Sequence, residues 1–417
     1  MKSLPVCLVT TGALFLGATI GMAVTQTPLG SPVFFALASV IGAAYLVMLA
    51  RIWHERTAPR RWLFVAFALA VAFRIPLALP RVGADSDIVR YVWDGRVQRL
   101  GYNPYTVVPA DPAMAATHTQ ETRQMPSRRA RTPYPPGAQL FFRLVVSLHD
   151  SSRAMKLALV ACDLLTIVVL WRWLVVSDRN VWLTLAYAWN PLVVLEVAHC
   201  GHIDALGSLW IAASAFWLTR RRTMLATIAF VLAVATKLLP IVLLPLFWRR
   251  VRLRDAVAGA IVFALLYLPF TSGAGLPLGA VHNVVAHIRF NGPLFKAIAG
   301  MTSPQGAAAA AVVLGLLVAA WARWRRPISD PAAWGWPMAT ALVGAPVIYP
   351  WYLLYLTPFL FSAATLPLIA WTFSVFPVYI VWDLARHGGE WRVPVSVMVA
   401  EYGVLAASAV WIFRRRR

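Results

Sequence analysis

The sequence predicts an all-α polytopic membrane protein, and three observations lead to that prediction. The chain has 417 residues, of which 60% are hydrophobic and 13% are charged, about half the charged fraction of a soluble domain. Its mean hydropathy is +0.68. Apolar runs long enough to cross about 30 Å of hydrocarbon recur along the whole chain. Because a lipid-embedded backbone must satisfy its own hydrogen bonds, these runs are expected to be helices.

The apolar runs place about 12–14 transmembrane helices, with an amphipathic first extracytoplasmic loop. Residues 223–248 are too short for two crossings, and Lys237, Pro240 and Pro245 should divide them into short helices that turn at membrane depth. The expected spans, each uncertain by several residues, are 5–25, 33–50, 62–80, 155–175, 181–198, 203–219, 223–236, 238–248, 255–270, 305–322, 333–348, 352–368, 369–384 and 394–413.

Clusters of arginine set the expected orientation. Basic loops stay on the cytoplasmic side of a membrane, and the clusters at 51–61, 220–222, 249–254, 323–326 and the C-terminus then place both termini in the cytoplasm. The formal charge of +22 is explained by these clusters, so no nucleic-acid partner is expected. The chain, 1–417, is expected to form a single integral membrane domain, whose large outer loops cover about 81–154 and about 271–304.

The first outer loop gathers carboxylates in a chain that has only 16 acidic residues. Asp85 and Asp87 would point about 200° apart on a helix, so both can serve one site only if the backbone is extended or turns there. A carboxylate beside lipid can take a proton from a hydroxyl group, and a pair of them can hold a divalent cation. The alternative is a set of solvated loop acids. Asp94 and Gly95 are expected to form a turn.

A second polar group follows in "AWNPLVVLEVAHCGHIDAL", near the outer end of two adjacent spans. It contains Glu196, His199, His202 and Asp204, and ionisable groups at membrane depth are costly and commonly functional. The spacing of Glu196 and Cys200 allows a metal site, whereas the spacing of His202 and Asp204 does not put both on one helix face. A polar network that steadies helix packing and a substrate-binding role both remain open.

Several cations are expected on the same face. Lys237 lies within an apolar stretch and needs an anionic partner, either a lipid phosphate or a carboxylate such as Glu196. Arg90 follows Asp87 by three residues and could pair with the aspartates or hold a phosphate in a bidentate manner. His287 and Arg289 belong to a further cationic group, "HNVVAHIRF". Together with Lys237 they indicate a binding locus for phosphate or pyrophosphate.

Six segments, taken in order, resemble one known group of enzymes. The chain is similar, from about residue 60 to 360, to the GT-C superfamily of glycosyltransferases, and within it to bacterial polyprenol-phosphate-mannose-dependent mannosyltransferases. The segments are "DSDIVRYVWDGRVQRLGYNPY", "TPYPPGAQLFF", "WNPLVVLEVAHCGHIDAL", "TKLLPIVLLP", "FNGPLF" and "YPWYLLYLTPFL". Each segment is weakly specific by itself, but their order on one membrane face is typical of the superfamily.

The resemblance implies a membrane glycosyltransferase that moves a sugar, with mannose expected, from a polyprenyl-phosphate carrier to a lipid or glycan acceptor with inversion. Asp87 matches the context of the catalytic base, and Asp85 is the second choice. Lys237 matches the residue that meets the donor phosphate, with Arg90, Arg289 and His287 in support. The substrate-binding residues are expected to be Glu196, His202, Asp204, Tyr134, Asn291 and Tyr352. No cofactor is expected, a divalent cation at Asp85 and Asp87 being the alternative.

The resemblance also implies a location and partners. A multi-pass protein of the bacterial inner (plasma) membrane is expected, with its active site on the periplasmic side and with donor, acceptor and membrane lipid as partners. The alternative function is a secondary transporter or flippase for lipid-linked or anionic substrates. Many transporters carry internal repeats and ionisable residues near the bilayer midplane. Here no repeat is visible and the ionisable residues gather on one face, which favours the enzyme.

Overall fold

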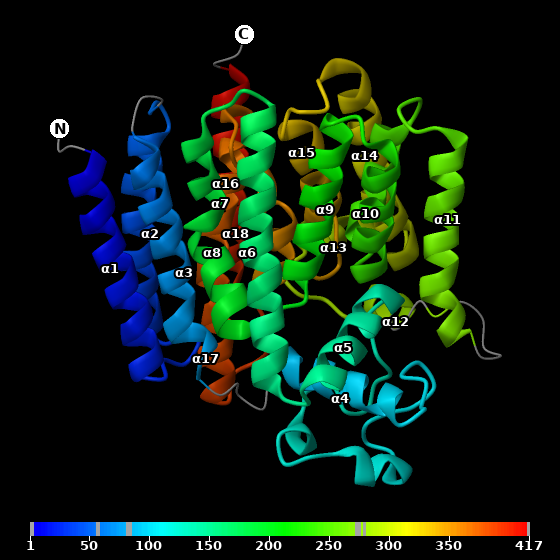
Figure 1. The fold of residues 1–417 in the computed structure, drawn as a ribbon. Coiled ribbons are helices and arrows are strands. Elements are labelled where there is room, and N and C mark those ends of the chain that lie inside the picture. Colours follow the sequence, from blue (N-terminus) through cyan, green and yellow to red (C-terminus); the bar gives the residue numbers. More distant parts are fainter. Residues whose placement is uncertain (1–3, 56–58, 81–85, 272–276, 278–280, 415–417) are drawn as a thin grey trace.

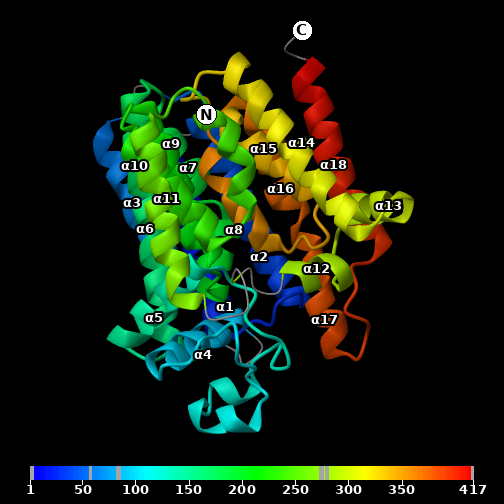
Figure 2. The same cartoon turned by 90° about the vertical axis from the view of Figure 1, so that its right-hand side faces the viewer.

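The computed structural model describes the chain except for residues 1–3, 56–58, 81–85, 272–276, 278–280 and 415–417. The described residues form helices without a named strand, and an isolated bridge joins Phe290 to Val347. Long helices stand side by side in one bundle (Figure 1). The start of α1 and the end of α18 lie at one end of this bundle, and α4 and α5 lie across the opposite end (Figures 1 and 2). The prediction of an all-α polytopic membrane protein is confirmed.

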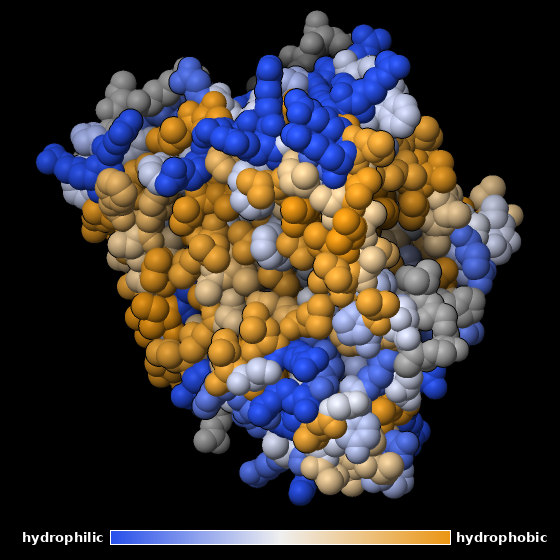
Figure 3. Space-filling model, turned by 45° about the vertical axis from the view of Figure 1, so that its right-hand side comes forward, coloured by the Kyte–Doolittle hydropathy of each residue, from blue (hydrophilic) through white to orange (hydrophobic). Residues whose placement is uncertain are grey.

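Eight helical segments in the described part of the chain are long and apolar enough to cross a membrane. Their side chains form a broad hydrophobic band between two polar ends (Figure 3). The segments are α1 (Leu4–Val24), α2 (Pro32–Ile52), α3 (Arg60–Ala78), α6 (Ser152–Val176), α11 (Leu253–Tyr267) continued by η6 (Leu268–Phe270), α14 (Pro304–Arg325), Ala363–Arg386 and α18 (Val395–Arg414). Ala363–Arg386 is built from η9 (Ala363–Thr365), α16 (Leu366–Ser374), η10 (Phe376–Tyr379) and α17 (Ile380–Arg386).

A further apolar segment is bent by 47°, and the described part of the chain has nine spans if this segment also crosses the membrane. It consists of η3 (Val181–Thr184), α7 (Leu185–Ala188), α8 (Pro191–Val193) and the π-helix η4 (Val194–Cys200). The other expected spans are helices of fewer than eighteen residues, which explains the difference between eight or nine and the expected 12–14. These are α9 (Asp204–Thr219), α10 (Thr223–Thr236), η5 (Leu239–Phe247), α15 (Ala332–Val343), η7 (Pro350–Tyr355) and η8 (Thr357–Phe359).

Residues 223–248 form the interrupted segment that the sequence predicts. Lys237 ends α10 in an extended conformation (φ −158°, ψ 144°), and the 3₁₀ helix η5 follows directly. The turn after α9 and the turn after η5 line the same cavity. The first residue of α10 and the last residue of η5 therefore lie at the same end of the bundle. Lys237 therefore lies at the tip of a re-entrant hairpin, which packs against α14 and α15.

The first outer loop folds into α4 (Asp87–Arg99), η1 (Pro112–Thr117), η2 (Thr122–Gln124) and α5 (Pro136–Leu148), and the second outer loop contains α12 (Val281–His287) and α13 (Pro293–Met301). The predicted turn at Asp94 and Gly95 is wrong, because both residues lie inside α4. The buried Asp94 carboxylate accepts hydrogen bonds from Arg90 Nε (2.7 Å), Thr132 Oγ1 (2.6 Å) and Gln139 Nε2 (2.8 Å). These bonds tie α4 to the start of α5 and hold the loop over the bundle.

A buried ion pair joins two of the long helices. Arg74 of α3 meets Asp163 of α6 through Nε–Oδ2 and through an Nη2–Oδ1 bond of 3.2 Å. Arg74 Nη1 also donates to the carbonyls of Ala70 (2.7 Å) and Ala188 (3.0 Å). Because both charges are buried and hydrogen-bonded, the pair fixes how α3, α6 and the end of α7 pack.

Candidate active site

Asp87 lies in the first turn of α4, at the end of the bundle that the first outer loop covers. Ser86 is the N-cap residue; its Oγ accepts a hydrogen bond from Ile88 N (3.5 Å) and donates to the carbonyl of Cys200 (3.3 Å). The start of α4 is thus tied to the end of η4. A helix N-terminus favours a negative charge, and the Asp87 side chain keeps 34% of its exposure. The backbone at Asp87 is therefore held in place, and the carboxyl remains accessible.

A glycine turn brings the second polar group beneath Asp87. Gly201 ends η4 in the left-handed conformation (φ 78°, ψ 47°), which glycine adopts without the strain that a side chain would add. A Cβ atom at this position would lie 2.6 Å from Ile88 Cδ1. The close approach of α4 to the turn places His202 and Asp204 next to the start of α4.

The His202 imidazole lies between two carboxyl groups. Its Nε2 is 3.1 Å from Glu196 Oε2, and its Nδ1 is 3.9 Å from Asp87 Oδ2. The ring stacks on Trp351 with centroids 4.0 Å apart and planes 9° apart. Nδ1 is buried, and no residue in the described part of the chain gives it a hydrogen bond. The ring is thus held rigidly with one nitrogen facing the gap beside Asp87.

Glu196 contacts the Nε2 side of the His202 ring. Its side chain is fully buried, and its Oε1 accepts a hydrogen bond from the Tyr379 hydroxyl. It belongs to the π-helix η4, and π-helical turns frequently occur at functional sites. Because Tyr379 lies in η10, the segment Ala363–Arg386 also contributes to the site.

Lys237 provides the cation of the site. Its Nζ lies 2.6 Å from Asp204 Oδ1 and 3.6 Å from the centre of the Tyr352 ring. Asp204 is 1% exposed and the lysine side chain 24% exposed. A buried carboxylate and an aromatic face thus hold the ammonium group, which has three hydrogens and can still donate to another anion.

The surroundings of Asp87 make it a stronger base than a free aspartate. Burial raises the pKa of the Asp87 carboxyl; the positive charges of His202 and Lys237 lower it, Asp204 raises it, and a hydrogen bond from Tyr134 lowers it. The net direction is upward. A carboxylate with a raised pKa accepts a proton more readily, and the Lys237 charge acts on the same group.

The structure brings most of the predicted site residues together, and it gives others different partners. Those within the site are Asp87, Glu196, His202, Asp204, Lys237, Tyr134 and Tyr352. Asp85 lies outside the described residues. Arg90 pairs with Asp94. Arg289 follows α12 and donates to its Val285 and Ala286 carbonyls, and His287 is exposed at the end of α12. Asn291 donates to Glu401 Oε2 (2.8 Å) in a separate buried cluster.

Two residues of the site were not among those predicted. Trp351 lies in the "YPWY" segment, but nothing in the sequence indicates that its indole supports His202. Tyr379 is one of several aromatic residues in its span, and its contact with Glu196 joins positions 183 residues apart. No pattern in the neighbouring sequence predicts either contact.

Three described residues of the site could together hold a metal ion. Glu196, Cys200 and His202 each offer one ligand atom, and these atoms lie within 4.8 Å of one another. Three protein ligands and an open position are the pattern of catalytic zinc sites. The Glu196–Cys200 spacing suggested such a site, and His202 is the third candidate ligand.

These observations define a class of protein: a multi-pass membrane protein with a carboxylate, an imidazole and an ammonium group gathered at one end of its helix bundle. A family model described as alpha-(1→6)-mannopyranosyltransferase, N-terminal domain (MptA_B family), matches residues 7–251. This match covers more than half of the chain, and the chain belongs to that family. It is a membrane glycosyltransferase of a mannosyltransferase family. No curated protein and no solved structure gave a significant match.

Proposed function

We propose that the protein transfers mannose from a polyprenyl-phosphate carrier to a hydroxyl group of a lipid or glycan acceptor, with Asp87 as the general base. The observation that carries this proposal is the shared environment of Asp87 and Lys237. One group accepts a proton, the other meets an anion, and the two lie close enough for the Lys237 charge to change the pKa of Asp87.

The reaction is a single displacement at the anomeric carbon. Asp87 removes the proton from the acceptor hydroxyl while its oxygen forms a bond to that carbon. The bond from the carbon to the phosphate oxygen breaks, and the phosphate leaves with the electron pair. The Lys237 ammonium, anchored by Asp204, stabilises the negative charge that develops on the phosphate.

His202 and Glu196 position the acceptor in this proposal. The unpartnered Nδ1 of His202 lies on the Asp87 side of the ring, where it can hydrogen-bond to a sugar hydroxyl. Trp351 and Tyr352 add the aromatic surfaces. Arg90, Arg289 and His287 remain predictions as phosphate ligands, and the proposal assigns the phosphate to Lys237.

Stereochemistry follows from the single displacement. The family is described by an α-(1→6) linkage, and one displacement inverts the anomeric configuration. For an α-linked product the donor must therefore be the β-linked mannosyl phosphate. We place the reaction on the extracytoplasmic face of a bacterial inner membrane, because the arginine-rich turns lie at the opposite end of the bundle.

The test is mannosyl transfer by the purified protein in liposomes, with radiolabelled β-mannosyl polyprenyl phosphate and a membrane-lipid acceptor extract. Asp87→Asn should lower kcat by about 10²–10⁴, the usual contribution of a positioned base, while donor binding is retained. Asp85→Asn is the matched control and should retain most activity. Full activity in the Asp87 variant, or an equal loss in the Asp85 variant, would contradict the assignment of the base.

A further inference from the structure

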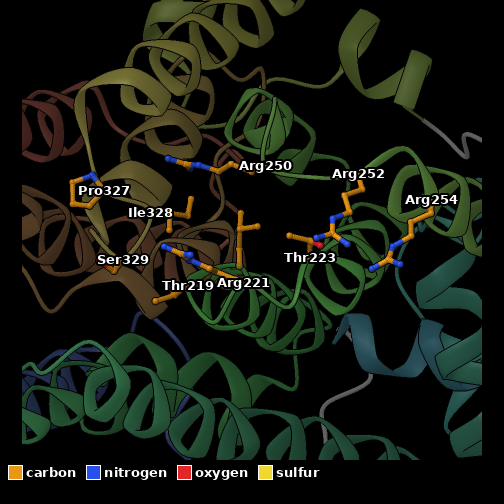
Figure 4. A pocket seen from close by; sticks show the side chains of 10 residues that line it. Thr219, Arg221, Thr223, Arg250, Arg252, Arg254, Pro327, Ile328 and Ser329 are labelled. Atoms are coloured by element: carbon orange, nitrogen blue, oxygen red, sulfur yellow. The ribbon is translucent and has the colours of Figure 1, made fainter.

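A second charged region lies at the end of the bundle opposite the candidate active site. It is a cleft of about 560 Å³ between three turns: α9 to α10, η5 to α11 and α14 to α15. In Figure 4, Pro327, Ile328 and Ser329 border one side, Arg252 and Arg254 lie on the opposite side, and Arg221 and Arg250 lie between them. A volume of this size is typical of ligand-binding clefts.

The cleft has a large excess of positive charge. The three turns, residues 219–223, 248–255 and 323–330, contain ten arginines and two aspartates. Both aspartates already have partners. Asp255 accepts hydrogen bonds from Thr223 Oγ1 (2.6 Å) and from the backbone N–H of Arg252 (3.2 Å), and Asp330 pairs with Arg326 (2.7 Å).

Arg250 shows the consequence of this imbalance most clearly. Its Nη1 donates to the carbonyl of Leu246 (3.3 Å), and no described carboxylate pairs with it. Partial burial and then the nearby Arg323 charge lower the pKa of Arg250 to about 10. Neither burial nor the Arg323 charge is offset by a nearby carboxylate that would raise this pKa.

The backbone of these turns is also strained at arginine positions. Arg221 and Arg249 have φ values of 56° and 57°, the left-handed region in which glycine normally ends a helix. A side chain in this region adds a conformational cost. The cost is incurred at Arg221, which lines the cleft, and at Arg249, which precedes the cleft residue Arg250.

The rule that basic loops remain cytoplasmic explains why arginines occur in these turns. It requires neither that they surround a common cleft nor that the cleft residues Arg221 and Arg250 have no ion pair with a described carboxylate. Guanidinium groups bind phosphate oxygens in a bidentate manner, and a phosphate group would supply the negative charge that the cleft lacks.

We infer that this cleft binds a phosphate group, carried either by the head group of an anionic membrane lipid or by a soluble phosphate. The site is separate from the transfer site. Asp204 lies at one end of α9 and the cleft at the other, and the sixteen residues of this helix span about 24 Å. The inference does not depend on the proposed transfer reaction.

The experiment uses the full-length protein in phosphatidylcholine nanodiscs. Two probes are compared: radiolabelled inorganic phosphate added to the solution, and phosphatidylglycerol included in the nanodisc, each followed by binding and by the shift in the thermal unfolding midpoint. The test variant is the double substitution Arg221→Gln/Arg250→Gln. The matched control is Arg60→Gln/Arg61→Gln, which removes the same charge from exposed positions at the start of α3, outside the cleft.

The test variant should lose at least about tenfold in affinity for one of the probes, whereas the control should bind like the wild type. Loss of the phosphate response identifies a soluble anion, and loss of the phosphatidylglycerol response alone identifies a lipid head group. Ser329→Glu, which places a carboxylate in the cleft and keeps every arginine, should weaken binding even if the double variant folds poorly. Absence of binding by the wild type, or equal losses in test and control variants, would overturn the inference.

Discussion

The two ends of the α9–α10 helical pair differ in how their charged side chains are paired. At one end Asp204 and Lys237 form a 2.6 Å ion pair, next to Glu196, His202 and Asp87. At the other end Arg221 belongs to a cleft with several arginines and few acids. The same two helices thus end in a group of paired charges of both signs at one end and in an excess of positive charge at the other.

The paired charges around Lys237 and the excess of arginines around the cleft are suited to different tasks. Charges that are paired and buried are held at fixed positions, as a reaction at a defined atom requires. Charges of one sign around an open cleft attract an ion of the opposite sign without the same geometric demand. The comparison suggests that substitutions at the first end change rates and that those at the second end change binding.

The largest effect that tests this comparison is expected at Lys237. Lys237→Met should lower kcat for mannosyl transfer by about 10²–10³, because the departing phosphate loses a positioned positive charge. Lys237→Arg keeps the charge and should restore part of the rate. The rates are measured in liposomes, with the thermal unfolding midpoint recorded to exclude misfolding. An unchanged rate per folded Lys237→Met molecule would make this lysine a structural residue.

A smaller effect is expected in the pH dependence of mannosyl transfer, where the direction of the shift is the test. Burial raises the pKa of Asp87 above its usual value, so kcat/KM should fall as the pH drops through a value above that of a free aspartate. The protonated His202 ring lowers the pKa of Asp87, and His202→Gln should therefore move the acidic limb to higher pH. A limb that moves to lower pH in this variant would contradict the proposed coupling.

The smallest expected effect is a difference in salt dependence between phosphate binding in the arginine cleft and donor binding at the candidate active site. Raising the ionic strength from low to physiological should weaken phosphate binding in the open arginine cleft by a few fold, because exposed charges are screened. The KM for the donor should change less, since Asp204 is buried and holds Lys237 in place. An equal dependence on salt at both ends would remove the distinction drawn between them.

The sequence predicts the positions of the spans well, because hydrophobic run length is a local property. The interruption at Lys237 is equally local, since a lysine followed by two prolines cannot continue an apolar helix. The spans that are shorter than a full crossing could not be separated from complete ones, because neighbouring helices supply the burial that hydropathy alone does not show.

The structure brings together only some of the residues that the sequence assigns to the site, and the differences in position have a geometric cause. The spacing of His202 and Asp204 argued against a metal site because a regular α-helix was assumed. The π-helix η4 and the left-handed Gly201 turn change the directions of both side chains. Arg90 was expected either to pair with the aspartates or to hold a phosphate, and it pairs with Asp94, one turn further along the same face.

The re-entrant hairpin of α10 and η5 has a consequence for the order in which the protein is assembled. η5 packs against α14 and α15, and these helices are synthesised more than fifty residues after it. The nascent hairpin therefore cannot reach its final depth until most of the chain has entered the bilayer. Completion of the candidate active site is therefore expected late in biogenesis, and truncated chains that end before α14 should leave η5, next to Lys237, without the helices on which it packs.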